Sequence, residues 1–327
     1  MYCLRNECAV LLHMTVLAVS DGRAGNVRQA RALADALNGE SAPHLHITPA
    51  APWRWFAPRR LPAAGYGLGA GFATALHDPP ALTVGCGRQA ALATRVLRDA
   101  GSHAVQILDP RIDPRHWDLV VAPEHDRLRG SNVLTLLGSL NPVDEAWLAA
   151  VRAHHPRPSP WGAGALTAVM IGGPTSAVTM TAQDVVAFVR GLVDEASATA
   201  SALVITTSGR TPRDWLPLLR DAVARSSATL WTGDGDGSNP YAVMLAYADR
   251  IVCTPDSVNM LSEACATGAQ VEWLPFAAGG RIATFLSALE ARRRACPLGA
   301  AMAADTTPLR ETARIADEIR QRLRASR

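Results

Sequence analysis

The 327-residue sequence contains no lysine, so all 32 of its basic side chains are arginines. That absence excludes a Walker-type phosphate-binding lysine, a Schiff base between lysine and pyridoxal phosphate, and a lysine general base. Any phosphate group must therefore be held by arginine, by backbone N–H groups or by helix N-termini. The formal net charge is only +3 and no nucleic-acid-binding motif occurs, so no nucleic-acid partner is expected.

Long apolar runs and metal-binding spacings are also missing. No stretch of 18 apolar residues occurs that could span a membrane. The six cysteines are scattered, without a CxxC or Cys/His pattern, and are typical of reduced thiols in a cytosolic protein. The composition, 48% hydrophobic and 19% charged, is that of a folded globular protein long enough for two domains. We therefore expect a cytoplasmic protein without a cysteine-based metal site.

The N-terminal residues match a signal peptide only in part. An arginine followed by an apolar stretch resembles a signal peptide, but Glu7 and His13 interrupt the apolar stretch. We therefore expect residues 1–13 to be a non-native or disordered extension, with the natural start at Met14.

Beyond that start, the pattern of strand, Gly-rich turn and helix repeats in both halves of the chain. Short buried strands alternating with helices indicate parallel sheets in an α/β fold. The Pro- and Gly-rich stretch "HHPRPSPWGAG" predicts a linker between the halves. We expect two Rossmann-like domains facing a cleft, divided as follows: 14–155 the N-terminal domain, 156–164 the linker, 165–300 the C-terminal domain, and 301–327 a C-terminal amphipathic helix.

The stretch "PDSVNMLSEACATG" (residues 255–268) predicts a helix after a buried strand. If Asp256 caps this helix and Gly268 ends it, then Met260 and Glu263 project on the same side as Asp256. Helix N–H groups favour a phosphate, and a carboxylate suits the vicinal hydroxyls of a sugar. The alternative is an exposed glutamate on an ordinary surface helix.

Three other turns of the second half follow strands. "IGGPTSA" offers Gly172 and Gly173, which allow close approach of a ligand to the backbone or simply form a tight turn. "TTSGRTP" offers Ser208 and Arg210 to a diphosphate. "GSNPY" offers Asn239 and Tyr241, although Asn-Pro is also a turn signal.

The acidic loop "DGDGSN" at residues 234–239 invites a metal interpretation. Position 12 of a Ca²⁺ loop starting at Asp234 is Leu245 rather than glutamate, so a solvated loop is favoured.

In the first half, "SDGRAGNVRQ" gathers polar residues around a predicted helix N-terminus. Asp21 is a candidate general base, and Glu124 and His125 of "PEHD", with Asp126, are rivals that the sequence does not separate. The remaining residues of this cluster are candidates for contact with a substrate: Gly22, Arg23, Gly25, Asn26 and Gln29.

Two further motifs have competing interpretations. "PWRWFAPRR" (residues 52–60) suits either internal packing or contact with an anionic membrane or a lipid-linked acceptor. "TVGCGRQA" (residues 83–90), with Asp109 further on, supplies most of a dinucleotide fingerprint and so a weaker case for an NAD-dependent enzyme.

The chain also resembles known proteins in "SEACATG" and the following "LPF", which are similar to the donor segment of GT-B glycosyltransferases such as the peptidoglycan N-acetylglucosaminyltransferase. From Met14 it is more similar to the bacterial mitochondrial fission ELM1-like family of glycosyltransferases, through "DGRAGNVRQA", "DPR", "APEHD", "NVLTLLG", "IGGP", "SGRTP", "NPY" and "DSVNMLSEACATG". Gln270 and Gly209 depart from the family pattern, where proline and a second arginine are expected.

The resemblance implies a metal-independent sugar transfer from a nucleotide-sugar donor, which would be substrate rather than cofactor. It implies that 14–155 is an acceptor domain and 165–300 a donor domain. Glu263 would bind the ribose, and the donor would contact these residues: Gly172, Gly173, Ser208, Arg210, Asn239, Tyr241, Asp256, Ser257 and Met260. The acceptor would contact the cluster that begins at Asp21. A lipid-linked acceptor, cell-envelope synthesis and peripheral contact with the inner membrane are further expectations. A nucleotide-sugar epimerase and a non-catalytic membrane-associated scaffold are the alternatives.

Overall fold

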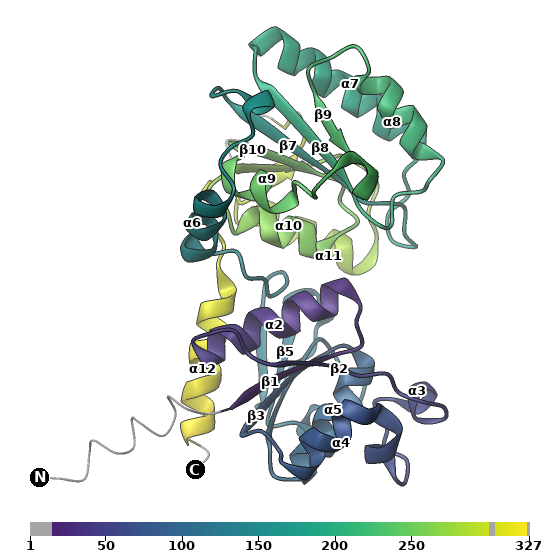
Figure 1. Ribbon diagram of the computed structural model, residues 1–327, viewed down its shortest axis with the longest axis vertical. Helices are drawn as coiled ribbons and strands as arrows, with labels where there is room; N and C mark the ends of the chain where they lie inside the picture. The colour runs from purple at the N-terminus through teal and green to yellow at the C-terminus, as the bar shows by residue number, and fades with distance from the viewer. Residues whose placement is uncertain (1–14, 301–304, 326–327) are drawn as a thin grey trace, which may run out of the picture. The chain divides into compact units, whose positions relative to one another are not determined.

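The computed structural model describes residues 15–300 and 305–325, so the N-terminal extension expected at 1–13 lies outside the described residues. The chain forms two compact units (Figure 1). One consists of the residues up to Pro142 together with the segment from Glu311, and the other of Val143–Arg310.

The first unit contains a six-stranded, all-parallel sheet in the order β2-β1-β3-β4-β5-β6. Its strands are β1 (Val16–Ser20), β2 (His44–His46), β3 (Leu82–Cys86), β4 (His103–Ile107), β5 (Leu119–Pro123) and β6 (Val133–Leu136). Its α-helices are α2 (Ala24–Asn38), α3 (Trp53–Phe56), α4 (Ala70–His77), α5 (Arg88–Asp99) and α12 (Glu311–Ala325), with 3₁₀ turns η1 (Ala64–Leu68), η2 (Pro114–His116) and η3 (Glu124–Asp126).

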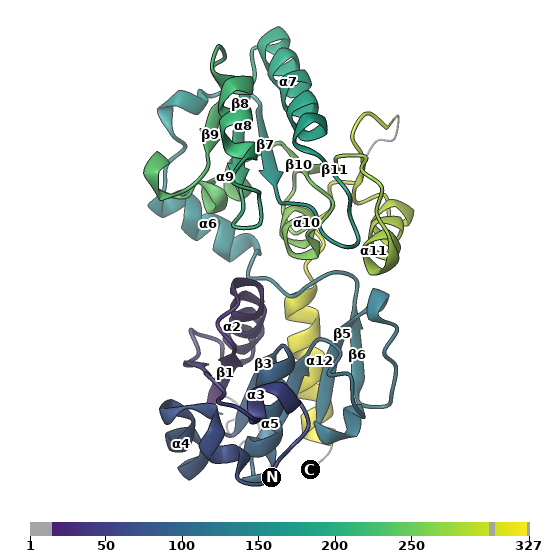
Figure 2. The same cartoon turned by 90° about the vertical axis from the view of Figure 1, so that its right-hand side faces the viewer.

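Helices cover both faces of this sheet. On one face, α2 and α12 pack side by side. The apolar stripe of the expected amphipathic helix, Ile315, Ile319 and Leu323, is buried there. On the other face, α5 and α4 bury Leu92, Leu97 and other apolar side chains. Figure 2 shows the sheet between these two helical layers. Successive side chains of a strand point to opposite faces of the sheet, so these buried strands contribute to a hydrophobic core on each face.

The second unit contains a six-stranded parallel sheet in the order β12-β11-β10-β7-β8-β9. Its strands are β7 (Leu166–Ile171), β8 (Ala202–Thr207), β9 (Thr229–Trp231), β10 (Arg250–Cys253), β11 (Gln270–Trp273) and β12 (Cys296–Pro297). Its helices are α6 (Glu145–His154), α7 (Ala182–Thr199), α8 (Trp215–Val223), α9 (Tyr241–Tyr247), α10 (Val258–Cys265) and α11 (Gly280–Ala291), with 3₁₀ turns η4 (Ser159–Trp161) and η5 (Asp234–Asp236).

The helices α7 and α8 pack on one face of this sheet through Val185, Val189 and Trp215, among other buried residues. Numbered within the unit, the strand order is 3-2-1-4-5-6, which is the order of dinucleotide-binding Rossmann folds. The expectation of two Rossmann-like α/β domains is therefore confirmed.

The boundary between the units differs from the expected one. Helix α6, which we assigned to 14–155, belongs to the second unit, because Arg152 Nε donates to the Ala246 carbonyl at 2.8 Å and the Tyr247 hydroxyl lies 3.1 Å from the His155 carbonyl. The predicted linker 156–164 is folded: Trp161 is only 4% exposed, and Arg157 donates to its carbonyl at 3.0 Å. The C-terminal helix returns to the first unit. Prolines and glycines here mark a compact turn, not a domain junction.

Candidate functional site

The carboxyl edge of the second sheet contains a topological switch point between β7 and β10. From β7 the chain continues outward to β8 and β9, whereas from β10 it continues in the opposite direction to β11 and β12. Loops that follow such a pair of strands diverge, and open parallel sheets bind their ligands there. The segments at this point are residues 172–177 after β7, 208–211 after β8 and 254–257 after β10.

The Asp256 carboxylate lies at the centre of these segments, and its side chain is fully buried. One oxygen accepts from Arg210 Nη2 at 2.5 Å, and the other accepts from the Thr254 hydroxyl at 2.6 Å. The backbone N–H of Gly173 also donates to it. Burial raises the pKa of the Asp256 carboxyl above its ordinary value, although these partners act in the opposite direction.

Gly172 and Gly173 are required by their own neighbours. A Cβ on Gly172 would lie 2.2 Å from an Asp256 carboxylate oxygen, and one on Gly173 would lie 2.2 Å from the Arg210 carbonyl oxygen. The N–H of Gly172 donates to the Thr254 hydroxyl at 2.7 Å. Both glycine N–H groups are thus used inside the protein, so these glycines shape the loop rather than present free donors to a ligand.

Arg210 is held on a fixed loop but keeps an accessible guanidinium. The Thr211 hydroxyl donates to the Gly172 carbonyl at 2.6 Å and accepts from the Ser208 N–H at 3.1 Å, which ties the β8 loop to the β7 loop. The Ser208 hydroxyl in turn accepts from the Arg210 N–H at 3.2 Å. The Arg210 side chain is nevertheless 51% exposed. A guanidinium anchored by one carboxylate can offer its remaining N–H groups to an anion.

Helix α10 begins at this point, but its cap differs from the expected one. Ser257 is the N-cap: its backbone is extended, and its hydroxyl accepts from the Met260 N–H at 3.4 Å. Asp256 does not cap the helix, because Arg210 and Thr254 hold its carboxylate. The helix ends at Cys265 with Ala266 as C-cap, so the expected end at Gly268 is also wrong.

Glu263 lies in the last turn of α10 and is only 3% exposed. The alternative of an exposed glutamate on a surface helix is therefore wrong. Burying a carboxylate costs free energy unless partners hold it, so the position of Glu263 inside the fold requires an explanation that a surface glutamate would not.

Asn239 and Tyr241 lie beyond β9, two strands away from β7. The Asn239 side-chain oxygen accepts from the Tyr241 N–H at 2.9 Å, so Asn239 supports the start of α9. In the preceding acidic loop, Arg220 and Thr232 hold Asp236. Among residues 15–300 and 305–325, no group of three or more His, Cys, Asp or Glu residues is arranged to hold a metal ion.

The first unit has its own switch point, between β1 and β3. Asp21 follows β1 and accepts from Asn26 Nδ2 at 2.9 Å; its side chain is 8% exposed, while that of Arg23 is 81% exposed. Asn26 reaches across to β3, since a Cβ on Gly87 would lie 2.4 Å from its amide nitrogen. Asn26 therefore bridges the two strands and does not cap α2, whose N-cap is Arg23.

The other residues of the cluster from Asp21 to Gln29 lie in different surroundings. Gly22 has a φ of +79°. Gly25 lies in the first turn of α2. Gln29 is only 5% exposed within the same helix. Of the six polar-cluster residues, the structure thus brings Asp21, Gly22 and Asn26 to the switch point and turns Gln29 inward.

Glu124 and His125 follow β5 in the turn η3, and His125 is 8% exposed. Three strand spacings separate β5 from β1, which is roughly 14 Å. Figure 2 shows β1 and β5 on opposite sides of the unit. These two residues therefore do not form one group with Asp21, and the three remain rivals.

Two histidines that sequence reasoning missed lie beside β1. His44 Nε2 is 2.9 Å from the Ser20 hydroxyl, and burial lowers the pKa of His44. His46 is exposed at the carboxyl end of β2, and a Cβ on Gly22 would lie 2.5 Å from its Nε2. Their i, i+2 spacing in "HLH" is the sequence signal, but the strand is too short and polar to be recognised alone.

The dinucleotide fingerprint is present in form only. Its glycine Gly87 should leave room for a pyrophosphate, but Asn26 lies against it. The acidic residue Asp109 accepts from the Arg111 N–H at 2.8 Å and forms an ion pair with the Arg111 side chain. Both positions have intramolecular partners.

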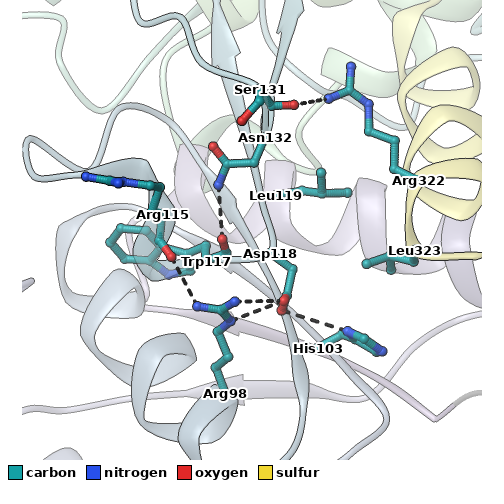
Figure 3. Close-up of a pocket in the computed structure, with 10 residues that line it drawn as sticks. All are labelled: Arg98, His103, Arg115, Trp117, Asp118, Leu119, Ser131, Asn132, Arg322 and Leu323. Carbon is teal, nitrogen blue, oxygen red and sulfur yellow. Dashed lines mark hydrogen bonds and ion pairs between the residues drawn. The ribbon is translucent and has the colours of Figure 1, made fainter. Parts of the chain in front are cut away.

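A pocket of about 230 Å³ opens at the opposite, amino-terminal edge of the first sheet (Figure 3). There Asp118 accepts from Arg98 at 3.0 and 3.2 Å and from the Ala104 N–H at 2.7 Å. Arg322 donates to the Ser131 carbonyl at 2.8 Å. Arg115, the remaining arginine of the lining, is paired with Asp113 at 2.7 Å. Each arginine of the pocket is thus held by a carboxylate or a carbonyl, so the pocket is a structural network.

Comparison with solved structures identifies the fold. The chain is similar to the UDP-GlcNAc 2-epimerase of Methanocaldococcus jannaschii in complex with UDP-GlcNAc and UDP, with a TM-score of 0.52, 11% identity, and 94% of this chain and 99% of that chain covered. It is equally similar to the calicheamicin glycosyltransferase CalG4, with a TM-score of 0.52, 13% identity, and 94% and 97% coverage. At such identities the likeness shows the fold alone, which is of the GT-B type.

Comparison with sequences identifies relatives. Mitochondrial fission protein ELM1 of Arabidopsis thaliana is 29% identical over 226 residues, which cover 59% of this chain and 51% of that protein. This chain thus spans about half the length of that relative. Uncharacterized protein RP120 of Rickettsia prowazekii (strain Madrid E) is 25% identical over 301 residues, covering 78% and 81%. The family model described as Mitochondrial fission ELM1 matches residues 24–323, so the chain belongs to this family, as the sequence motifs indicated.

Proposed function

We propose that the protein is a metal-independent glycosyltransferase that moves a sugar from a nucleotide-sugar donor to an acceptor hydroxyl. The observation that carries the proposal is the convergence of the half-exposed Arg210 guanidinium and the first turn of α10 at the switch point between β7 and β10. Both features bind anions, and they lie where an α/β sheet binds its ligand.

In this proposal the diphosphate of the donor binds Arg210, the hydroxyls of Ser208 and Ser257, and the N-terminus of α10. The N–H groups of Gly172 and Gly173 are already used by Thr254 and Asp256, so these glycines hold the loop in shape. Asp256 anchors Arg210, because the salt bridge fixes the guanidinium at the mouth of the site.

The nucleoside half of the donor would lie along α10 and toward α9. Glu263 would accept from the ribose hydroxyls, and Met260 would contact the nucleoside. The amide NH₂ of Asn239 would donate to the base, and Tyr241 would stack on it.

Sugar transfer breaks the bond between the anomeric carbon and the diphosphate, and negative charge develops on the leaving oxygen. Arg210 and the positive end of α10 would stabilise that charge without a metal ion. The acceptor hydroxyl would lose its proton to Asp21, Glu124 or His125. Gly22, Arg23, Gly25, Asn26 and Gln29 would contribute to the acceptor side.

We further propose a lipid-linked acceptor of cell-envelope glycoconjugate synthesis. Such an acceptor would be presented at the inner membrane, so the protein would act in the cytoplasm with peripheral membrane contact. In the described part of the chain, no helix has the length and apolar character needed to cross a bilayer.

A nucleotide-sugar epimerase is the second candidate, favoured by the likeness to the UDP-GlcNAc 2-epimerase. The test is incubation with a panel of nucleotide sugars, with and without bacterial membrane lipids as the source of acceptor. Released nucleotide is measured by coupled assay and the sugars by NMR. A transferase releases nucleoside diphosphate in the presence of acceptor, and an epimerase changes the sugar without net release. Neither change with any donor would contradict both proposals and favour a non-catalytic scaffold.

A further inference from the structure

The segment around α3 exposes large aromatic side chains. Trp55 is 62% exposed, Phe56 50% and Tyr66 92%. Only one other large hydrophobic side chain of the described residues, Leu218, is comparably exposed. Figure 1 shows α3 at the outer edge of its unit, beyond α5. Isolated exposed apolar residues need no explanation, but Trp55 and Phe56 are neighbours on α3, and α3 contacts η1, which carries Tyr66.

The backbone of this segment is fixed by the body of the unit. Arg88 of α5 donates to the carbonyls of Trp55 and Arg54 at 3.3 and 3.2 Å. Arg95 donates to the Pro58 carbonyl at 2.7 Å. Trp53 is the inward-facing aromatic of α3 and packs against the core that includes α5. The backbone that carries the exposed Trp55 and Phe56 is therefore held in place by α5.

The formal charges within this segment are all positive. Residues 41–77 contain three arginines and neither aspartate nor glutamate. Arg60 forms an ion pair with Asp99 of α5. Arg54 and Arg59 are exposed and have no ion pair with any other residue in the described ranges. Along the chain, the acidic residues that flank this segment are Glu40 and Asp78.

We infer that this aromatic–arginine patch, formed by Arg54, Trp55, Phe56, Arg59 and Tyr66, docks onto the surface of an anionic lipid bilayer. Tryptophan and tyrosine favour the headgroup region, where an apolar ring and a polar atom are both satisfied. Arginines beside them pair with lipid phosphates and are attracted by the negative surface potential. The inference rests on the proposed function in that it assigns a surface to the peripheral membrane contact, whereas its vesicle test is independent of the donor site in the second unit.

The test is co-sedimentation of the full chain with vesicles of phosphatidylcholine alone and of equimolar phosphatidylcholine and phosphatidylglycerol. We expect binding to the anionic vesicles only. A variant with Arg54→Gln and Arg59→Gln should bind about 30-fold more weakly, from roughly fivefold per arginine at an anionic surface. Raising the salt from about 0.1 to about 1 M should weaken binding similarly, because the Debye length falls about threefold.

A second variant, with Trp55→Ala, Phe56→Ala and Tyr66→Ala, should lose binding at both salt concentrations while keeping the thermal unfolding midpoint of the wild type. The matched control carries Leu218→Ala and Arg225→Gln, an exposed apolar residue and an exposed arginine of the second unit. Equal binding by the aromatic variant, or equal binding by the control and the patch variants, would overturn the proposal. So would patch-dependent dimerisation in analytical ultracentrifugation without vesicle binding.

Discussion

Substitution of Arg210 by glutamine should destabilise the second unit by an amount set by the burial of Asp256. The pair is half buried: the Asp256 side chain is fully buried, whereas that of Arg210 is 51% exposed. Breaking a fully buried pair costs about 3–5 kcal/mol, and breaking an exposed pair costs at most about 1 kcal/mol. We expect Arg210→Gln to lower the free energy of unfolding by about 2 kcal/mol at pH 7.

The pH dependence of this loss tests its origin. Burial raises the pKa of Asp256 above its ordinary value of 3.8 in the folded protein, and loss of Arg210 raises it further. A folded state with a raised carboxyl pKa binds the proton more tightly than the unfolded state, so this carboxyl favours folding as the pH falls. The difference in stability between wild type and Arg210→Gln should therefore shrink as the pH is lowered toward 3.8.

Calorimetric unfolding measures both effects. A loss of about 2 kcal/mol corresponds to roughly 4–8 °C in the midpoint of a unit of this size. Asp256→Asn added to Arg210→Gln should restore stability to within about 1 kcal/mol, since the uncompensated charge is gone. Arg213→Gln, three residues along and also exposed, is the matched control. An unchanged midpoint for Arg210→Gln, or a double variant as unstable as the single, would refute the reasoning.

Three further predictions concern the same unit. Gly173→Ala should lower the free energy of unfolding by more than about 2 kcal/mol, because its Cβ would lie 2.2 Å from the Arg210 carbonyl oxygen. A thermal unfolding midpoint equal to that of the wild type would contradict this. Thr254→Val, in a denaturant titration, should cost about 1–3 kcal/mol because both Asp256 and a glycine N–H lose the hydroxyl. Burial raises the pKa of Cys265 to about 12, so this thiol should resist iodoacetamide at pH 8 until the protein unfolds, as mass spectrometry of labelled peptides would show.

The strands with apolar runs were predictable from the sequence. Leu166–Ile171 and Ala202–Thr207 are buried almost throughout, so composition alone identifies them. The edge strands His44–His46 and Cys296–Pro297 were missed, because two or three residues give no periodicity. The amphipathic stripe of Glu311–Ala325 was predicted, but not the return of this helix to the first unit, which depends on contacts remote in sequence.

The site was predictable as a set of loops but not as a set of contacts. Asp256 and Ser257 are both good N-cap residues, so propensity cannot choose between them. In the structure Ser257 is the N-cap, because the Asp256 carboxylate is paired with Arg210, 46 residues away, and does not cap the helix. Likewise, the glycines after β7 predict a close approach, but only the structure shows that the approaching groups are Asp256 and the Arg210 carbonyl.

The proposed donor site is tested most directly by calorimetric binding of UDP, GDP, CDP, TDP, CMP and NAD to the wild type and to Glu263→Gln and Arg210→Gln. We predict that the wild type binds one nucleoside diphosphate and binds CMP and NAD only weakly. Arg210→Gln should weaken binding of that diphosphate about tenfold or more, because a charge-assisted contact is lost. Glu263→Gln should also weaken its binding. Arg213→Gln should bind as the wild type does. Binding of no diphosphate, or of NAD alone, or binding unaffected by both site variants, would contradict the assignment of this switch point as a nucleotide-sugar site.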